Sequence, residues 1–325
     1  MTIKKNLLLG ITSIIAITFI ISSFSKNSET TLPINKPTSF KENYGIFPVE
    51  IPKNIEYAGE KVPIENFDVF ESLDREMLIN TYWQSQTLII IKKSKRYFPI
   101  IEPILKENGV PDDLKYLAVA ESGLSNVTSP SGAKGFWQFL KGTATDHKLE
   151  INTEVDERYH LEKATQAACE FLKKSYDKYG SWSMAAASYN MGRRNLSQYA
   201  NRQKSNNYYD LILGDETGRY VYRLIALKLI MQTPNKFGFY IKPNHKYPKI
   251  DYTVIEIDTA VNHWADFAHA NDINYKILKE LNPWLRENKL TNAKRKTYQI
   301  KIAKKGIRNI LPNPEFYPED SLLIE

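Results

Sequence analysis

This sequence has little cysteine, no paired histidines and, over much of its length, no strand-like alternation. Its 325 residues contain one cysteine, Cys169, which excludes an internal disulfide and a lipid-modified cysteine near the N-terminus. Cys169 lies in an alanine-rich stretch, which is typical of a small buried side chain rather than a reactive thiol. The five histidines follow no metal-binding spacing, so we expect no metal site and no cofactor.

No strand-like alternation of useful length occurs between residues 71 and 235. Apolar residues recur there at helical spacing, and Gly180, Gly192 and Pro234 are typical helix ends. The sequence therefore predicts a mainly α protein with an all-α domain. We expect helices over 70–93, 96–109, 159–179, 182–191 and 216–232, together with one that begins near Pro111 and carries Glu121.

The two ends of the chain differ from this helical part. Residues 1–25 contain an uncharged apolar run from Leu7 to Phe24 after two lysines, which predicts an export signal or a retained membrane anchor. Residues 26–64 are interrupted by prolines and are expected to be a linker and lead-in. Residues 312–325 combine prolines and acids, which is typical of a mobile tail.

A smaller module is expected at residues 251–303. Its segments "YTVIEI" and "TYQIKIA" have strand character, and two short helical patterns lie between them, which indicates a β-α-α-β unit. Residues 241–311 hold 14 Lys and Arg against 7 Asp and Glu, in a chain of formal net charge +7. On an exported protein this surplus favours an anionic partner such as a cell-wall polymer or lipid headgroups rather than nucleic acid. A solvated basic face without a partner is the alternative.

One carboxylate stands out in the stretch "LAVAESGLSN". Glu121 follows Leu114, Leu117 and Ala118 at helical spacing, so it shares the face that this helix is expected to bury. Desolvation and the negative end of the helix dipole near Gly123 both raise the pKa of such a carboxyl group. A carboxylic acid that stays protonated near neutral pH can act as a general acid. The alternative is a Glu121 that reaches solvent or pairs with an arginine.

Polar and aromatic groups follow Glu121 in three further stretches. Gly132 and Gly135 allow tight turns around Gln138, where three aromatic residues are expected to form a wall suited to a sugar chain. These rings are Phe136, Trp137 and Phe139. A helix of small residues ends in Tyr189 and Asn190, which could line the same cleft. Tyr220 faces the core on an apolar stripe and its hydroxyl needs a partner, unless it is only core filler.

The motifs "AESGL", "SPSGAKGFWQF", "AAASYNMG" and "ETGRYV", in this order, resemble the soluble-lytic-transglycosylase domain family. The resemblance implies a lysozyme-like fold over residues 65–240, peptidoglycan glycan strands as the partner, and Glu121 as the single catalytic acid and base. It implies substrate-binding roles for Ser122, Ser129, Gln138, Tyr189, Asn190 and Tyr220. The segments "YTVIEIDTA", "LKELNPWL" and "YQIKIA" resemble a degenerate LysM wall-binding module.

The residues from Ser122 to Thr145 include no Asp or Glu, although glycosidases generally use two carboxylates. Asp112, Asp146 or Glu154 could fold back to supply a second one. A single acid suffices when a hydroxyl of the substrate attacks, and the resemblance implies cleavage between N-acetylmuramic acid and N-acetylglucosamine with 1,6-anhydro ends. A hydrolytic muramidase and a non-catalytic wall-binding scaffold are the alternatives.

Overall fold

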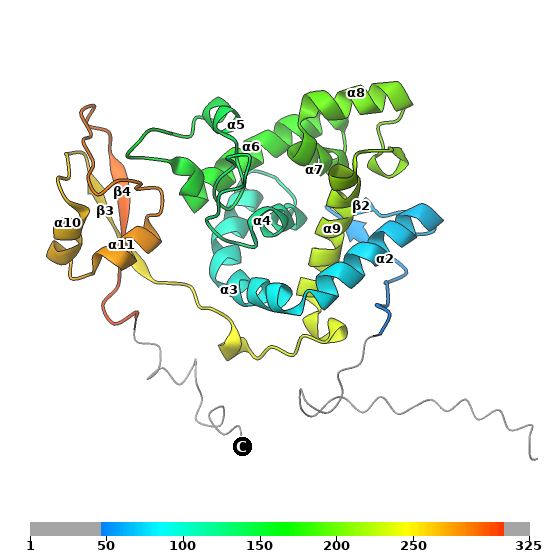
Figure 1. Ribbon diagram of the computed structural model, residues 1–325, viewed down its shortest axis with the longest axis horizontal. Coiled ribbons are helices and arrows are strands. Elements are labelled where there is room, and N and C mark those ends of the chain that lie inside the picture. The colour runs from blue at the N-terminus through cyan, green and yellow to red at the C-terminus, as the bar shows by residue number, and fades with distance from the viewer. Residues whose placement is uncertain (1–46, 309–325) are drawn as a thin grey trace, which may run out of the picture. The chain divides into compact units, whose positions relative to one another are not determined.

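Helices dominate the chain, as Figure 1 shows for a computed structural model that describes residues 47–308. The prediction of a mainly α protein is confirmed. The larger part is built from α2 Phe67–Tyr82, α3 Gln84–Glu107, α4 Lys115–Ser122, α5 Lys141–Asp146, α6 Leu161–Tyr179, α7 Trp182–Met191, α8 Arg193–Gln203 and α9 Asp215–Gln232. Short 3-10 turns are η1 Asp112–Leu114, η2 Glu157–Tyr159, η3 Tyr208–Asp210, η4 Pro234–Phe237 and η5 Pro243–His245.

The expected export segment at residues 1–25 and the expected tail at residues 312–325 lie outside the described residues. Within residues 47–308, no helix is both long and apolar enough to cross a bilayer.

Helix α4 lies in the middle of the helical part, where it packs against α3 and α9 (Figure 1). Its apolar face is fully buried, because Leu114, Leu117 and Ala118 have no exposed surface. The helix ends at Gly123, whose backbone is left-handed with a φ of 57° and donates its N–H to Val119 O. Helix α4 is therefore held in place by both α3 and α9.

The boundary between the first two helices differs from the sequence prediction. Two segments were expected at 70–93 and 96–109, but the break lies at Trp83, and α3 then continues through Pro99 and Pro103. Each proline removes one intrahelical hydrogen bond. The helix persists because it buries an apolar stripe on both sides of the prolines, which includes Ile91 before them and Leu105 after them.

The described part of the expected lead-in packs into the helical core. Ile55, Tyr57 and Val62 are buried in and around the hairpin of β1 Glu56–Tyr57 and β2 Glu60–Lys61. At the turn of this hairpin, the Glu60 carboxylate reaches the first residues of α7. It accepts hydrogen bonds from the backbone N–H of Trp182 and Ser183 and from the hydroxyls of Ser181 and Ser183. Glu60 therefore supplies a negative charge and a cap to the N-terminus of α7.

We expect Glu60→Ala to lower the free energy of unfolding by about 1–2 kcal/mol, because the N–H groups of the first turn of α7 lose their acceptor. Urea unfolding followed by circular dichroism measures this change. Glu65→Ala is the matched control, since Glu65 forms an exposed i,i+4 pair with Lys61 and its loss should change the stability by less than about 0.5 kcal/mol. Equal effects of both variants would contradict the capping role.

The C-terminal module has the expected β-α-α-β order. Strands β3 Tyr252–Ile257 and β4 Tyr298–Ala303 pair antiparallel, and α10 Trp264–Ala270 and α11 Tyr275–Leu281 lie between them in the chain. The module has its own apolar core around Trp264, Leu278 and Ile300. Two residues from the helical part, Val155 and Tyr159, complete this core. The module is therefore packed onto the helical part through the segment that precedes α6.

Candidate functional site

A carboxyl group and a phenol meet where α4 packs against α9. Glu121, on the last turn of α4, is half-buried, and Tyr220, on the second turn of α9, is 2% exposed. The Tyr220 hydroxyl donates a hydrogen bond to Glu121 Oε1 over 2.5 Å. The partner that the buried Tyr220 hydroxyl needed is thus the carboxylate that the helical pattern had singled out.

The environment of Glu121 favours its protonated form. The pKa of Glu121 is raised to about 7, and burial is the largest cause. The Tyr220 hydrogen bond lowers this pKa, the Glu216 carboxylate raises it and the Arg223 guanidinium lowers it. Near neutral pH the group is therefore divided between acid and carboxylate. Such a group can donate a proton in one step and accept one in the next.

The end of α7 borders this pair. Burial raises the pKa of Tyr189 well above its usual value, and the Glu121 charge raises it further, so the phenol stays protonated. Its hydroxyl donates to Trp137 O over 2.7 Å. Next to it, Asn190 donates to Glu216 Oε1 over 3.2 Å. These contacts tie α7 both to the loop after α4 and to the first turn of α9.

The other predicted site residues lie after Glu121 in the chain. Ser122 donates its hydroxyl hydrogen bond back to Ala118 O over 2.9 Å and accepts one from Ser125 N. Ser129 and Gln138 lie in residues 127–139, a segment hereafter named the site loop. The hydrogen bonds that the structure gives to these two side chains stay within that loop.

Gln138 has an unusual backbone. Its φ is 48°, which is uncommon for a residue other than glycine and marks a position that the surrounding structure must hold. Its side-chain amide donates to Gly135 O over 2.7 Å and to Val127 O over 3.1 Å. The site loop is thus wound tightly around the Gln138 side chain, which is half-buried.

The expectation that three rings form a sugar-facing wall is wrong. Phe136, Trp137 and Phe139 are at most 3% exposed and belong to the core. Trp137 donates its indole N–H to Thr165 Oγ1, and Phe136 packs edge-on against Tyr97 with 4.7 Å between ring centroids. The rings hold the site loop against the helices, because burial of their apolar surface stabilises the fold.

Two charged groups at the site were not expected from the sequence. Glu216 and Arg223, both on α9, act on the charge of Glu121 with opposite signs. Of the acids that could have folded back, Asp112 pairs with Lys115, Asp146 is exposed at the end of α5, and Glu154 binds Thr291 in the C-terminal module. The carboxylate with an electrostatic effect on Glu121 is therefore Glu216, and its spacing of one turn from Tyr220 was the available signal.

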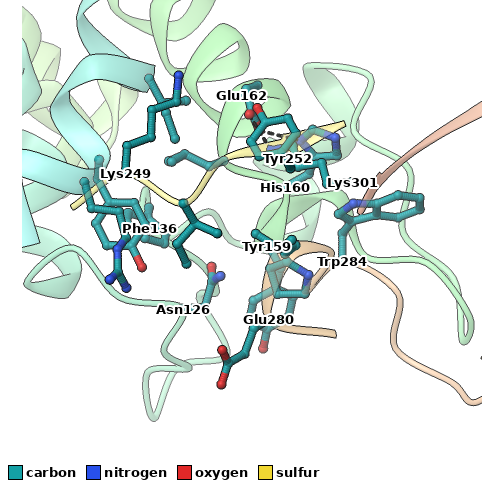
Figure 2. Close-up of a pocket in the computed structure, with 17 residues that line it drawn as sticks. Asn126, Phe136, Tyr159, His160, Glu162, Lys249, Tyr252, Glu280, Trp284 and Lys301 are labelled. Carbon is teal, nitrogen blue, oxygen red and sulfur yellow. Dashed lines mark hydrogen bonds and ion pairs between the residues drawn. The ribbon is translucent and has the colours of Figure 1, made fainter. Parts of the chain in front are cut away.

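A separate pocket of about 90 Å³ lies where the helical part meets the C-terminal module (Figure 2). Side chains of both parts line it, including Tyr159 and His160 from the one and Trp284 and Lys301 from the other. Phe136 also lines this pocket, but neither Glu121 nor any of the predicted substrate-binding residues does.

Each of the two parts of the chain includes a stretch that matches a known family. Residues 98–212 match the family described as "Transglycosylase SLT domain", and residues 253–306 match the "Soluble lytic transglycosylase C-terminal LysM-like domain". The first match includes Glu121 and the end of α7 but stops before Tyr220.

Individual proteins match over about half of the chain. The curated relatives are the proteins named membrane-bound lytic murein transglycosylase D of Escherichia coli K12 and of E. coli O6:H1, each 27% identical over 182 residues, or 54% of this chain. The chain spans 39% of the length of these relatives. Among solved structures, the 70 kDa soluble lytic transglycosylase of E. coli aligns with 55% of this chain and 33% of its own, at 16% identity and a TM-score of 0.40.

Proposed function

Because the chain carries a transglycosylase SLT domain followed by the LysM-like domain of soluble lytic transglycosylases, we propose that it is a lytic transglycosylase of peptidoglycan. The bond cleaved is the β-1,4 bond between N-acetylmuramic acid and N-acetylglucosamine, and the product carries a 1,6-anhydro end. The observation that carries the proposal is Glu121, a half-buried acid whose pKa is raised to about 7 and which Tyr220 holds in place.

The proposed reaction uses one carboxyl group twice. Protonated Glu121 gives its proton to the glycosidic oxygen, and the bond from that oxygen to the anomeric carbon of the muramyl sugar breaks. The acetamido oxygen of the same sugar shares the positive charge. The Glu121 carboxylate then takes the proton of the muramyl O6 hydroxyl as that oxygen bonds to the anomeric carbon, which restores the acid. An intramolecular hydroxyl can gain about 7–11 kcal/mol over a bimolecular attack, so no second carboxylate is required.

The remaining predicted residues are assigned to substrate binding. Tyr189 lies near Glu121, and Asn190 binds Glu216 on the first turn of α9. Ser122 is the last residue of α4, and Ser129 and Gln138 lie in the site loop that follows it. Tyr220 is the positioning group for the Glu121 carboxyl. The LysM-like module would bind glycan, and the protein would act after export, facing the cell wall, with its N-terminal segment as a signal or as a membrane attachment.

The nature of the product ends tests this function. Sacculi digested in water enriched in heavy oxygen should give anhydro ends without the heavy isotope, because the attacking oxygen comes from the sugar. Reducing ends that carry the heavy isotope would identify a hydrolytic muramidase instead. Binding to sacculi without any cleavage would identify a wall-binding scaffold. Mass spectrometry of the released fragments separates the three results.

We expect Tyr220→Phe to shift the pH profile of cleavage. Loss of the hydrogen bond to the Glu121 carboxylate raises the pKa of Glu121, so the group stays protonated to higher pH. A hydrogen bond to a charged group is worth about 1.5–3 kcal/mol, which predicts an alkaline limb about one to two pH units higher, with a lower maximal rate. Rate measurements between pH 5 and 9 check this expectation.

Tyr222→Phe is the matched control for this experiment. Tyr222 is also a buried tyrosine on α9, and it lies two residues further along the helix, among Tyr208 and Tyr209. Its variant should leave the pH profile unchanged. An alkaline limb that stays in place in Tyr220→Phe would show that the Tyr220 hydroxyl has no influence on the titrating acid.

A further inference from the structure

The LysM-like module contacts the helical part at Glu150, at Glu162 and along residues 154–160, a segment hereafter named the linking segment. Val155 forms an antiparallel bridge with Leu285, Asp156 N donates to Trp284 O over 2.9 Å, and Arg286 N donates to Glu154 O over 2.8 Å. The module thus adds strand-like backbone pairing to this segment, which is stronger and more specific than contact between side chains alone.

Side chains reinforce the same contact. The Glu154 carboxylate accepts hydrogen bonds from the backbone N–H and the hydroxyl of Thr291, over 2.7 and 2.6 Å. The Arg286 guanidinium lies 4.2 Å from the centre of the Tyr159 ring. Figure 2 shows Tyr159, His160 and Trp284 around the pocket at this junction, where the His160 and Trp284 rings stack. The linking segment is therefore held on its outer side by the module.

The inner side of the linking segment holds the site loop. Arg158 forms two hydrogen bonds with the Asp156 carboxylate, over 2.9 and 2.7 Å, and both side chains are about 95% buried. The Arg158 guanidinium also donates to Gly132 O and to Phe139 O, each over 3.3 Å. One buried cation therefore fixes the middle and the end of the loop that carries Ser129 and Gln138.

Further contacts run along the same route. Thr128 Oγ1 and the Tyr159 hydroxyl share a hydrogen bond of 2.8 Å. Gly135 lies so close to the linking segment that a Cβ on it would stand 1.9 Å from Arg158 O. The module, the linking segment and the site loop are thus joined by hydrogen bonds at each step, from Trp284 O through Asp156 and Arg158 to the loop carbonyls.

We propose that the LysM-like module positions the site loop, so that it takes part in setting the active site in addition to any binding of glycan. Asp156 and Arg158 are the positioning residues. Without the pairing at Trp284 and Leu285, the linking segment would be free to move, and Arg158 would lose the fixed place from which it holds the loop. The effect of the module on the site loop is inferred from the contacts described above, whereas an effect on catalysis rests on the proposed function.

The test weakens the contact between the module and the linking segment by substitutions in the module, made in the full chain. Arg286→Ala combined with Thr291→Val removes the Arg286 side chain from the Tyr159 ring and the Thr291 hydroxyl hydrogen bond to Glu154, but leaves the sequence of the linking segment and the site loop unchanged. The matched control, Arg295→Ala combined with Thr253→Val, changes the same residue types in the module, where Arg295 pairs with Asp258 and Thr253 is exposed. Thr291→Val alone serves if the double variant does not fold.

Hydrogen exchange of the amides in residues 127–139 is the first measurement. We expect about tenfold faster exchange in the junction variant and none of this change in the control. Unchanged exchange in the site loop, with faster exchange confined to the module, would overturn the proposal. This measurement needs no activity, so it holds even if the protein proves not to cleave glycan.

Steady-state kinetics on a short soluble glycan fragment is the second measurement. A module that positions the loop predicts a kcat about tenfold lower with KM changed less than twofold, because the chemical step depends on loop geometry. A module that only binds glycan predicts a higher KM at unchanged kcat. Faster loop exchange with unchanged kcat would show that the module stabilises the loop without affecting the reaction, which would also overturn the positioning role.

Discussion

Glu121→Gln is expected to lower the rate of glycan cleavage by about 100- to 10,000-fold, because an amide can neither donate nor accept the proton. The side chain keeps its size and can still receive the Tyr220 hydrogen bond on its oxygen. Binding to sacculi should therefore remain within about twofold of the wild type. Release of soluble fragments, measured beside a pull-down on intact sacculi, gives both quantities.

The same variant makes a second, independent prediction about stability. Burial raises the pKa of Glu121 from 4.5 to about 7, so the folded state holds the proton more tightly than the unfolded state does. The contribution of protonated Glu121 to the free energy of unfolding of the wild type is fully present below about pH 4.5, and it is lost as the pH rises towards 7. Between about pH 4.5 and 7 the wild type should therefore lose stability relative to Glu121→Gln, because the amide does not titrate. The difference in the free energy of unfolding should shift in favour of the variant as the pH rises.

Glu107→Gln is the matched control, since Glu107 is an exposed residue at the end of α3. It should cleave at the wild-type rate and show no such gain in stability. Cleavage by Glu121→Gln at a rate near that of the wild type would remove the chemical basis of the proposed function. A gain in stability without any loss of rate would show that Glu121 is buried but not catalytic.

The sequence was most informative for α4, because the spacing within this one helix predicted which residues are buried. Leu114, Leu117, Ala118 and Glu121 share a face by spacing alone, and the structure buries this face as expected. The spacing could not show which group lies opposite Glu121. Tyr220 comes 99 residues later, and only the packing of α4 against α9 brings the two together.

Other features depend on tertiary packing that a local pattern does not record. Helix α8 was not predicted because its apolar face is narrow, with Leu196 and Ala200 as its buried residues. The aromatic residues of the site loop were misread because an apolar ring next to a polar side chain suits a core as well as a ligand. The role of Glu60 was missed because its partners on α7 lie more than 120 residues away.

Gly135→Ala is the prediction with the second largest effect. The backbone of Gly135 has a φ of 82°, and a Cβ there would lie 1.9 Å from Arg158 O and 2.8 Å from Arg158 C. Both contacts are with backbone, so no side chain can turn away to relieve them. We expect a loss of more than about 3 kcal/mol in the free energy of unfolding, or a displaced site loop with cleavage reduced in proportion.

Gly132→Ala is the control that separates the strain of a positive φ from the clash of a Cβ with the Arg158 backbone. Gly132 has the same φ of 82° and lies in the same loop, but a Cβ on it would have no other atom within 4 Å. Its variant carries only the conformational strain, about 1 kcal/mol. Urea unfolding gives the loss in the free energy of unfolding for each variant. The loss in Gly135→Ala minus the loss in Gly132→Ala is the cost of the clash with the Arg158 backbone. Equal losses would mean that the site loop can move away from Arg158 at little cost, and Arg158 could then not be what holds Gln138 in its strained conformation.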